Sequence, residues 1–95
     1  MKRRGATVVR VEDASTLIIR PYMAVRLAGV EAPLRGSPEA EMARRKLEEL
    51  TLNKKIEFEV QEWDRLGCGI AMVWLDGSSL NEAMRTYIEG LGKKN

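Results

Sequence analysis

The hydrophobic pattern in the first third of the chain predicts three short β-strands. Two β-branched runs, residues 7–11 and 16–19, flank a polar group at residues 12–15 and indicate a β-hairpin. A third apolar run, residues 24–28, follows a proline break, and Pro33 ends regular pairing after it. We therefore expect a three-stranded meander at the start of the fold.

The next segment carries the signals of an α-helix. Ser37 suits the N-cap, Pro38 suits the first helical position, and Glu39 places negative charge near the positive end of the helix dipole. Apolar residues then recur at helical spacing for about four turns. These residues are Ala40, Ala43, Leu47 and Leu50. Asn53 is expected to end the helix in a left-handed conformation.

The last third predicts two more strands and a closing helix. Residues 56–61 alternate between apolar and polar side chains, as in a strand with one buried face. Residues 69–75 are almost wholly apolar, which is typical of a strand inside a barrel, so Trp74 is expected in the core. Ser79 and Glu82 match a capping box for the last helix, and Gly90 is its expected end.

This order of elements predicts a mainly β protein of the α+β class. Five strands, with one helix between strands three and four and another after strand five, match a small, partly open barrel. An open α+β sheet and an unrelated five-stranded roll are alternatives with the same order of elements.

The composition fits one small globular domain, expected to span residues 1–95. The chain has 95 residues, 44% of them hydrophobic and 32% charged, and a domain of this size is too small for a deep cofactor pocket. Sixteen basic and 14 acidic side chains leave a net charge of +2. That balance does not by itself favour a nucleic-acid partner.

The cysteine and histidine counts exclude two kinds of site. The sequence has one cysteine, Cys68, and no histidine, so neither an internal disulfide nor a Cys/His zinc site can form. No apolar run has the length of a signal peptide or a membrane span. We therefore expect a reduced, cytoplasmic protein that does not contact a membrane.

Five short motifs follow one another along residues 6–92. They are residues 9–17, residues 25–33, the Asp-Arg-Leu-Gly turn at 64–67, residues 71–74, and Asp76-Gly77 followed by residues 81–83. In this order and spacing they resemble the staphylococcal nuclease-like (thermonuclease) family, whose members form OB-fold barrels. Active members hydrolyse DNA and RNA with one calcium ion, two aspartates, a water-activating glutamate and two phosphate-binding arginines.

The resemblance implies a dismantled catalytic site in this chain. Ser15 stands where the family has a metal-binding aspartate, Glu31 where it has the second aspartate, and Arg26 keeps the first arginine. Leu34 stands in place of the glutamate, and Cys68 in place of the second arginine. A hydroxyl adds no charge for calcium, an aliphatic side chain accepts no proton, and a thiol cannot clamp a phosphate.

The first functional hypothesis is a catalytically degenerate nuclease-like domain that works by binding. Its partner would be single-stranded nucleic acid or a protein, and no cofactor is expected. The expected nucleic-acid contacts are Arg26, Arg65 and Trp63. Two of them also have a structural interpretation: Arg26 could pair with Glu31, and Trp63 could cover the end of the barrel. Cys68 is expected to be a small packing residue.

The second hypothesis is a residual calcium-dependent nuclease. Here Asp13, Glu31, Glu39 and Arg65 would have taken over the missing roles, with Asp13 and Glu31 as weak metal ligands. Calcium is expected as a cofactor only under this hypothesis. Calcium-dependent cleavage of DNA or RNA distinguishes it from the first.

Overall fold

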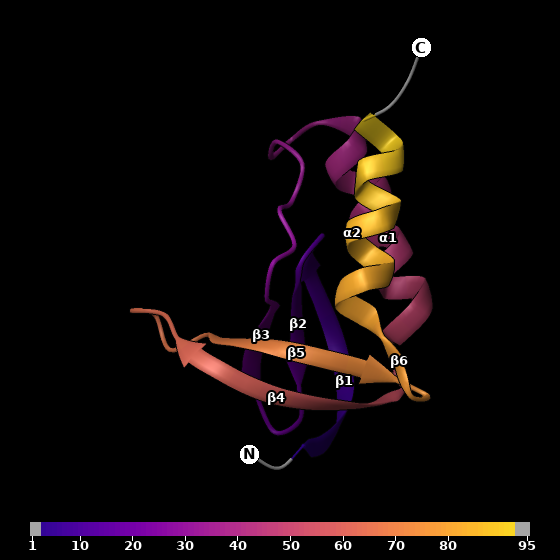
Figure 1. Ribbon diagram of the computed structural model, residues 1–95. Coiled ribbons are helices and arrows are strands. Elements are labelled where there is room, and N and C mark those ends of the chain that lie inside the picture. Colours follow the sequence, from indigo (N-terminus) through magenta and orange to yellow (C-terminus); the bar gives the residue numbers. More distant parts are fainter. Residues whose placement is uncertain (1–2, 93–95) are drawn as a thin grey trace.

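This computed structural model describes residues 3–92, which form six strands and two helices joined by loops (Figure 1). The strands are β1 (Arg4–Asp13), β2 (Thr16–Ile19), β3 (Met23–Leu27), β4 (Lys55–Trp63), β5 (Gly69–Leu75) and β6 (Ser78–Ser79). The helices are α1 (Pro38–Thr51) and α2 (Leu80–Gly92). The predicted order is confirmed, and β6 only adds a two-residue pairing at the edge of β5.

The strands close into a barrel. Neighbours in the order β3-β2-β1-β4-β5-β6 are antiparallel, and β3 also pairs in parallel with β5, through Val25 with Gly69 and Leu27 with Ala71. This contact joins the two ends of the five-strand sheet, so the predicted barrel is confirmed and the open-sheet alternative is wrong. Both helices lie together on one side of the barrel (Figure 1).

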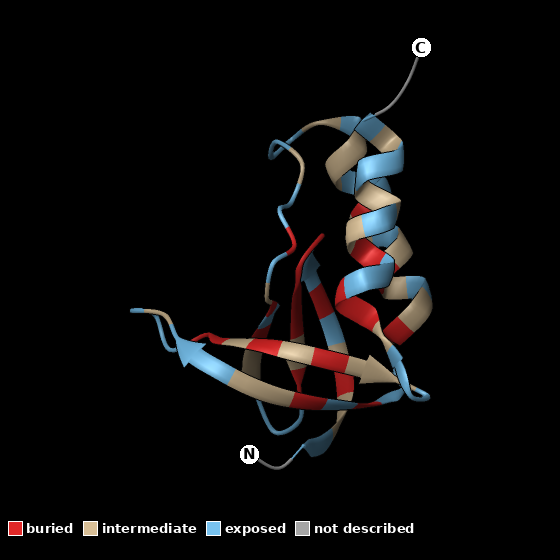
Figure 2. Cartoon of the chain, in the orientation of Figure 1, coloured by how far each residue is buried: buried red, intermediate tan, exposed pale blue. Residues whose placement is uncertain are grey.

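The core fills the barrel and the space beneath the helices. Figure 2 shows buried residues on the strands and at the ends of the helices nearest the barrel. Val8 and Val11 of β1 are both buried although they are three positions apart. A bulge between Val8 and Arg10 explains this spacing, because an extra residue reverses the side to which the following side chains point.

The ends of α1 confirm the sequence signals. The Ser37 hydroxyl accepts a hydrogen bond from the Ala40 N–H at 3.1 Å, Pro38 begins the helix, and Asn53 has φ +65°. At α2, the Ser79 hydroxyl likewise accepts from the Glu82 N–H at 3.1 Å. Each predicted N-cap therefore satisfies one of the open backbone donors of its helix.

The expected end of α2 at Gly90 is wrong. The helix continues to Gly92, because Leu91 in this last turn still packs against the core. Tertiary packing here outweighs the low helix propensity of glycine. No helix in residues 3–92 has the length and apolar character needed to cross a membrane.

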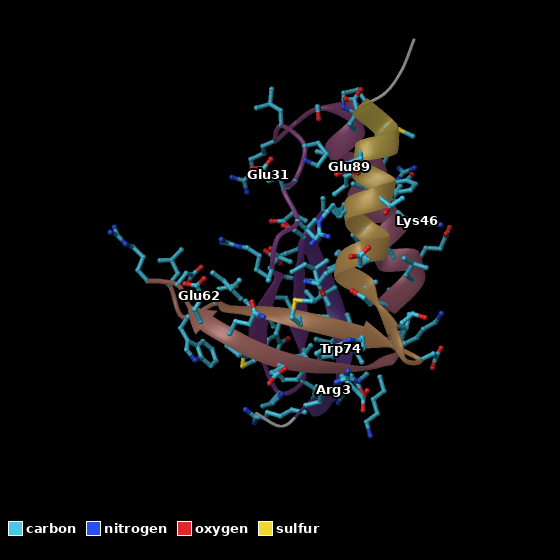
Figure 3. The ribbon with its side chains drawn as sticks, in the orientation of Figure 1. Arg3, Glu31, Lys46, Glu62, Trp74 and Glu89 are labelled. Atoms are coloured by element: carbon cyan, nitrogen blue, oxygen red, sulfur yellow. The ribbon has the colours of Figure 1, made fainter. Side chains whose placement is uncertain are left out.

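The expectation that Trp74 lies in the core is also wrong. Its neighbour Val73 is fully buried, so Trp74 points to the other side of β5 and is only half-buried. The Arg3 guanidinium stacks on the Trp74 ring, 3.6 Å from its centroid, and pairs with Glu57 at 3.5 Å (Figure 3). Arg3 thus covers the outward-facing ring of Trp74 on the outer surface of the barrel.

The β4–β5 hairpin projects beyond the rest of the barrel (Figure 1). β1 pairs with β4 only from Lys55 to Phe58, and the far end of β4 pairs with β5. The hairpin turn at residues 64–67 therefore lies at the tip of an arm, and Figure 2 shows exposed residues along its end.

Candidate functional site

Three of the five positions singled out by the family resemblance meet at one mouth of the barrel. Thr16, which follows Ser15, pairs with Arg26, and the Leu27 N–H donates to the Ser15 carbonyl at 2.8 Å. Arg26 also lies beside β5, whose first residue, Gly69, directly follows Cys68. Ser15, Arg26 and Cys68 therefore come from three segments that the barrel brings together.

Ser15 is held inside the β1–β2 turn. It is 6% exposed, and its N–H and Oγ both donate to Asp13 Oδ1, at 2.9 and 3.4 Å. This hydrogen bonding is that of an Asx turn, in which the aspartate oxygen stabilises the backbone. One oxygen of Asp13 is therefore already used by the turn.

Arg26 pairs with Asp64 of the hairpin turn. Its Nη2 lies 3.3 Å from Asp64 Oδ2, while Asp64 Oδ1 accepts from the N–H groups of Cys68 and Leu66 at 2.8 and 2.9 Å. The Cys68 N–H is the largest of the interactions that lower the pKa of Asp64. The ion-pair partner of Arg26 is thus Asp64 and not Glu31.

Cys68 is buried and has no disulfide partner within the described residues. Burial raises the pKa of its thiol, and the negative charge of Asp64 adds to this effect. The side chain is therefore a neutral thiol that offers no charge to a phosphate.

Glu31 lines a groove between the segment that follows β3 and helix α2. The groove has a volume of about 530 Å³, and Arg26, Arg85 and Glu89 also line it. Arg85 Nε donates to the Gly29 carbonyl at 3.1 Å. In Figure 3, Glu31 on the loop and Glu89 on α2 lie on either side of the opening.

Arg85 and Glu89 were not expected from the sequence. A helical repeat places them on one face of α2, but no sequence signal indicates where that face docks. Gly29 lies beside Arg85: it has φ +73°, and its missing Cβ would lie 2.9 Å from an Arg85 guanidinium nitrogen. Gly29 thus admits Arg85 to the groove.

Leu34 lies on a second, neighbouring cleft. Its side chain is 83% exposed. The cleft has a volume of about 510 Å³ and is lined by Pro33, Leu34, Ser37, Glu39, Ile88, Leu91 and Gly92. Ile88 lines this cleft and the Glu31 groove, so the two adjoin. The position that the resemblance assigns to the catalytic glutamate therefore carries an exposed aliphatic side chain.

No single cleft holds all the groups that the second hypothesis needs. Asp13 lines a third cleft, of about 640 Å³, with Arg35 and Arg44. Glu31 and Glu39 line the two adjoining clefts, and Arg65 lies in the hairpin turn. Within residues 3–92, no three acidic or cysteine side chains converge as metal ligands would.

A calcium ion requires six to eight oxygen ligands, with affinity set largely by the number of carboxylates. At the two positions that resemblance assigns to metal binding, Ser15 directs its hydroxyl to Asp13 and Glu31 supplies one carboxylate. One charged group with an internally bonded hydroxyl does not fit that requirement.

Trp63 and Arg65 lie near the tip of the arm. Trp63 is 56% exposed and lies over Gly69, where a Cβ would come 3.3 Å from its ring. Arg65 is exposed, and no ion pair involves it among residues 3–92. The ring thus covers Gly69 with one part and leaves more than half of its surface open.

A relative among known proteins matches most of the chain. No family model matches it. The micrococcal nuclease of Shigella flexneri is 34% identical to it over 70 residues, which cover 70% of this chain and 40% of that nuclease. The chain therefore matches less than half the length of this relative.

Proposed function

We propose that this chain, which is a staphylococcal nuclease-like domain, binds a partner protein and does not cleave phosphodiester bonds. The membership of this family rests on the barrel with its two helices and on the similarity to a micrococcal nuclease. A fold does not fix a function, so the proposal depends on the chemistry of the individual positions.

Leu34 is the observation that carries the proposal. A general base must accept a proton and lie within hydrogen-bonding reach of the attacking water. The Leu34 side chain can do neither, and at 83% exposure it offers an apolar surface to solvent instead. Loss of a positioned base alone removes roughly 10²- to 10⁴-fold of rate.

The neighbouring positions support the same proposal. Ser15 contributes no charge, and Cys68 is a buried neutral thiol rather than a cation. Arg26 remains, but Asp64 neutralises it at 3.3 Å. A developing negative charge on a phosphate would therefore meet little stabilisation here.

Single-stranded nucleic acid is a second candidate partner, which Trp63 favours. An exposed aromatic ring is a stacking platform for a base, and the neighbouring Arg65 could contact a phosphate. A gel shift with short single-stranded DNA and RNA at several salt concentrations tests this candidate. Phosphate contacts require affinity to fall steeply as salt rises.

The test of the main proposal is a cleavage assay on plasmid DNA and on RNA, with calcium and with a chelator. We expect no calcium-dependent cleavage. Cleavage that requires calcium and disappears in Glu31→Ala would overturn the proposal in favour of a residual nuclease.

A gain-of-function variant provides the converse test. Restoring the family residues together, as Ser15→Asp, Leu34→Glu and Cys68→Arg, is expected to create detectable calcium-dependent cleavage. A folded triple variant without cleavage would mean that the backbone of this chain no longer holds these positions in the geometry of the family.

A further inference from the structure

We propose that the adjoining clefts beside Ile88 form one docking groove for a partner segment that carries an apolar anchor residue flanked by lysine or arginine. We call this surface the Leu34 groove. Its apolar floor is Pro33, Leu34, Ile88 and Leu91, and its acidic rim is Glu31, Glu39 and Glu89. The inference rests on the proposed function in one respect, that the partner is a protein.

The floor of the groove is apolar and open. Leu34 projects from the loop that joins β3 to α1 and is 83% exposed. Ile88 and Leu91 of α2 and Pro33 line the same cleft. An exposed leucine is unremarkable alone, but beside other apolar side chains in a cleft it offers a place for a partner's apolar anchor.

The rim carries negative charge that is not paired within residues 3–92. No hydrogen bond or ion pair involves the carboxylates of Glu31, Glu39 or Glu89 in the described part of the chain. The arginines of the Glu31 groove are already engaged, Arg26 by Asp64 and Arg85 by Glu82.

Arg35, the next residue after Leu34, is the nearest cation along the loop. It lines the separate cleft that contains Asp13, Glu41 and Arg44. Three carboxylates that have no ion-pair partner among residues 3–92 surround an apolar floor. They therefore complement a basic, partly apolar segment, and they repel the phosphates of a nucleic acid.

The probe is a fluorescein-labelled peptide of about 14 residues, made of leucine and lysine with leucines at helical spacing. The matched control has glutamate in place of every lysine. Fluorescence anisotropy at several salt concentrations measures both affinities. We expect the lysine peptide to bind, with affinity falling as salt rises, and the glutamate peptide not to bind.

Two leucine variants locate the binding. Leu34→Ala is expected to lower the affinity for the lysine peptide about 10-fold, as for a central apolar anchor. Leu66→Ala is the matched control, since Leu66 is 88% exposed but lies in the hairpin turn outside the groove. It should leave affinity unchanged. Both side chains are largely exposed, so neither change is expected to unfold the protein, which circular dichroism verifies.

A charge variant tests the rim. Glu89→Gln is expected to weaken binding roughly 3-fold at low salt and to have no effect at high salt. Peptide-induced NMR shifts are expected at residues 31–39 and 85–91.

Several results would overturn the inference. They are absence of binding, equal binding of the glutamate peptide, equal losses in Leu34→Ala and Leu66→Ala, displacement of the peptide by a thymidine oligonucleotide, or a dimer of this chain that buries Leu34. If the lysine peptide does not bind and no calcium-dependent cleavage is seen, only this inference is overturned. Calcium-dependent cleavage would instead overturn the proposed function.

Discussion

Asn81 is expected to be among the most sensitive positions for stability. Its side chain is 0% exposed and makes three hydrogen bonds to backbone groups. Its Oδ1 accepts from the Val73 N–H at 2.7 Å, and its Nδ2 donates to the carbonyls of Ala28 and Ala71 at 2.8 and 3.1 Å. One amide thus joins the start of α2 to β5 and to the segment after β3.

The cost of Asn81→Ala follows from the backbone groups that it leaves. The Ala71 carbonyl keeps a second bond, from the Ala28 N–H at 2.9 Å. The Val73 N–H loses its buried partner, and an unsatisfied buried polar group costs about 1–3 kcal/mol. The Ala28 carbonyl is only part-buried and lines the groove, so water can replace its lost partner. The loss is therefore about 1–3 kcal/mol, a large part of the roughly 5–15 kcal/mol that holds a domain folded.

Urea unfolding followed by far-ultraviolet circular dichroism measures this loss. Asn81→Leu is the matched control because it restores side-chain volume without restoring hydrogen bonds, and we expect it to remain strongly destabilised. A loss below about 1 kcal/mol in the alanine variant would refute the reasoning, since it would fall below the cost of one unsatisfied group. Recovery of stability in the leucine variant would show that volume, not hydrogen bonding, is what matters.

Asn81→Asp adds a pH test. At neutral pH its carboxylate would face two carbonyl oxygens, whereas a protonated carboxyl can donate to one of them. Its stability deficit relative to the unmodified chain is therefore expected to shrink between about pH 7 and pH 4. An unchanged deficit would contradict the hydrogen-bond assignment at Nδ2.

Two further substitutions and one reactivity measurement have clear expected outcomes. The hydrogen bond from the Cys68 N–H is the largest of the interactions that lower the pKa of Asp64 below 3.8. The Asp64 carboxylate therefore stabilises the fold above pH 3.8, and this stabilisation is lost as the pH falls through the lowered pKa. Asp64→Asn should make acid unfolding less steep. Gly29→Ala should destabilise more than Gly77→Ala in urea unfolding, because both have positive φ but only at Gly29 would the Cβ press on Arg85. The Cys68 thiol should react with a disulfide reagent only at the rate of unfolding, and fast reaction of the folded protein would contradict its burial.

The candidate site shows where reasoning from the sequence stops. The resemblance identified Leu34 as a position of interest, because its neighbours Ala32 and Pro33 keep the motif and so fix the position that Leu34 occupies in it. Arg85 and Glu89 carried no such signal, because their importance arises from the docking of α2 beside the β3–α1 loop. The pairing of Arg26 with Asp64 likewise joins residues 38 positions apart.

The sequence by itself determined the elements and their order. Local signals act over a few residues, so Ser37 and Ser79 predicted the helix starts and Asn53 the end of α1 without knowledge of the rest of the chain. Alternation of side chains predicted the strands in the same way.

Only the tertiary structure decided which side of each element is covered and where each ends. Trp74 belongs to an apolar run, yet it points outward under Arg3, and α2 continues past Gly90 because Leu91 still packs on the core. Closure of the barrel by β3 and β5, and the single buried amide of Asn81 that ties α2 to them, depend on contacts between distant segments. Such contacts form only once burial of the shared core offsets the entropy lost in bringing those segments together.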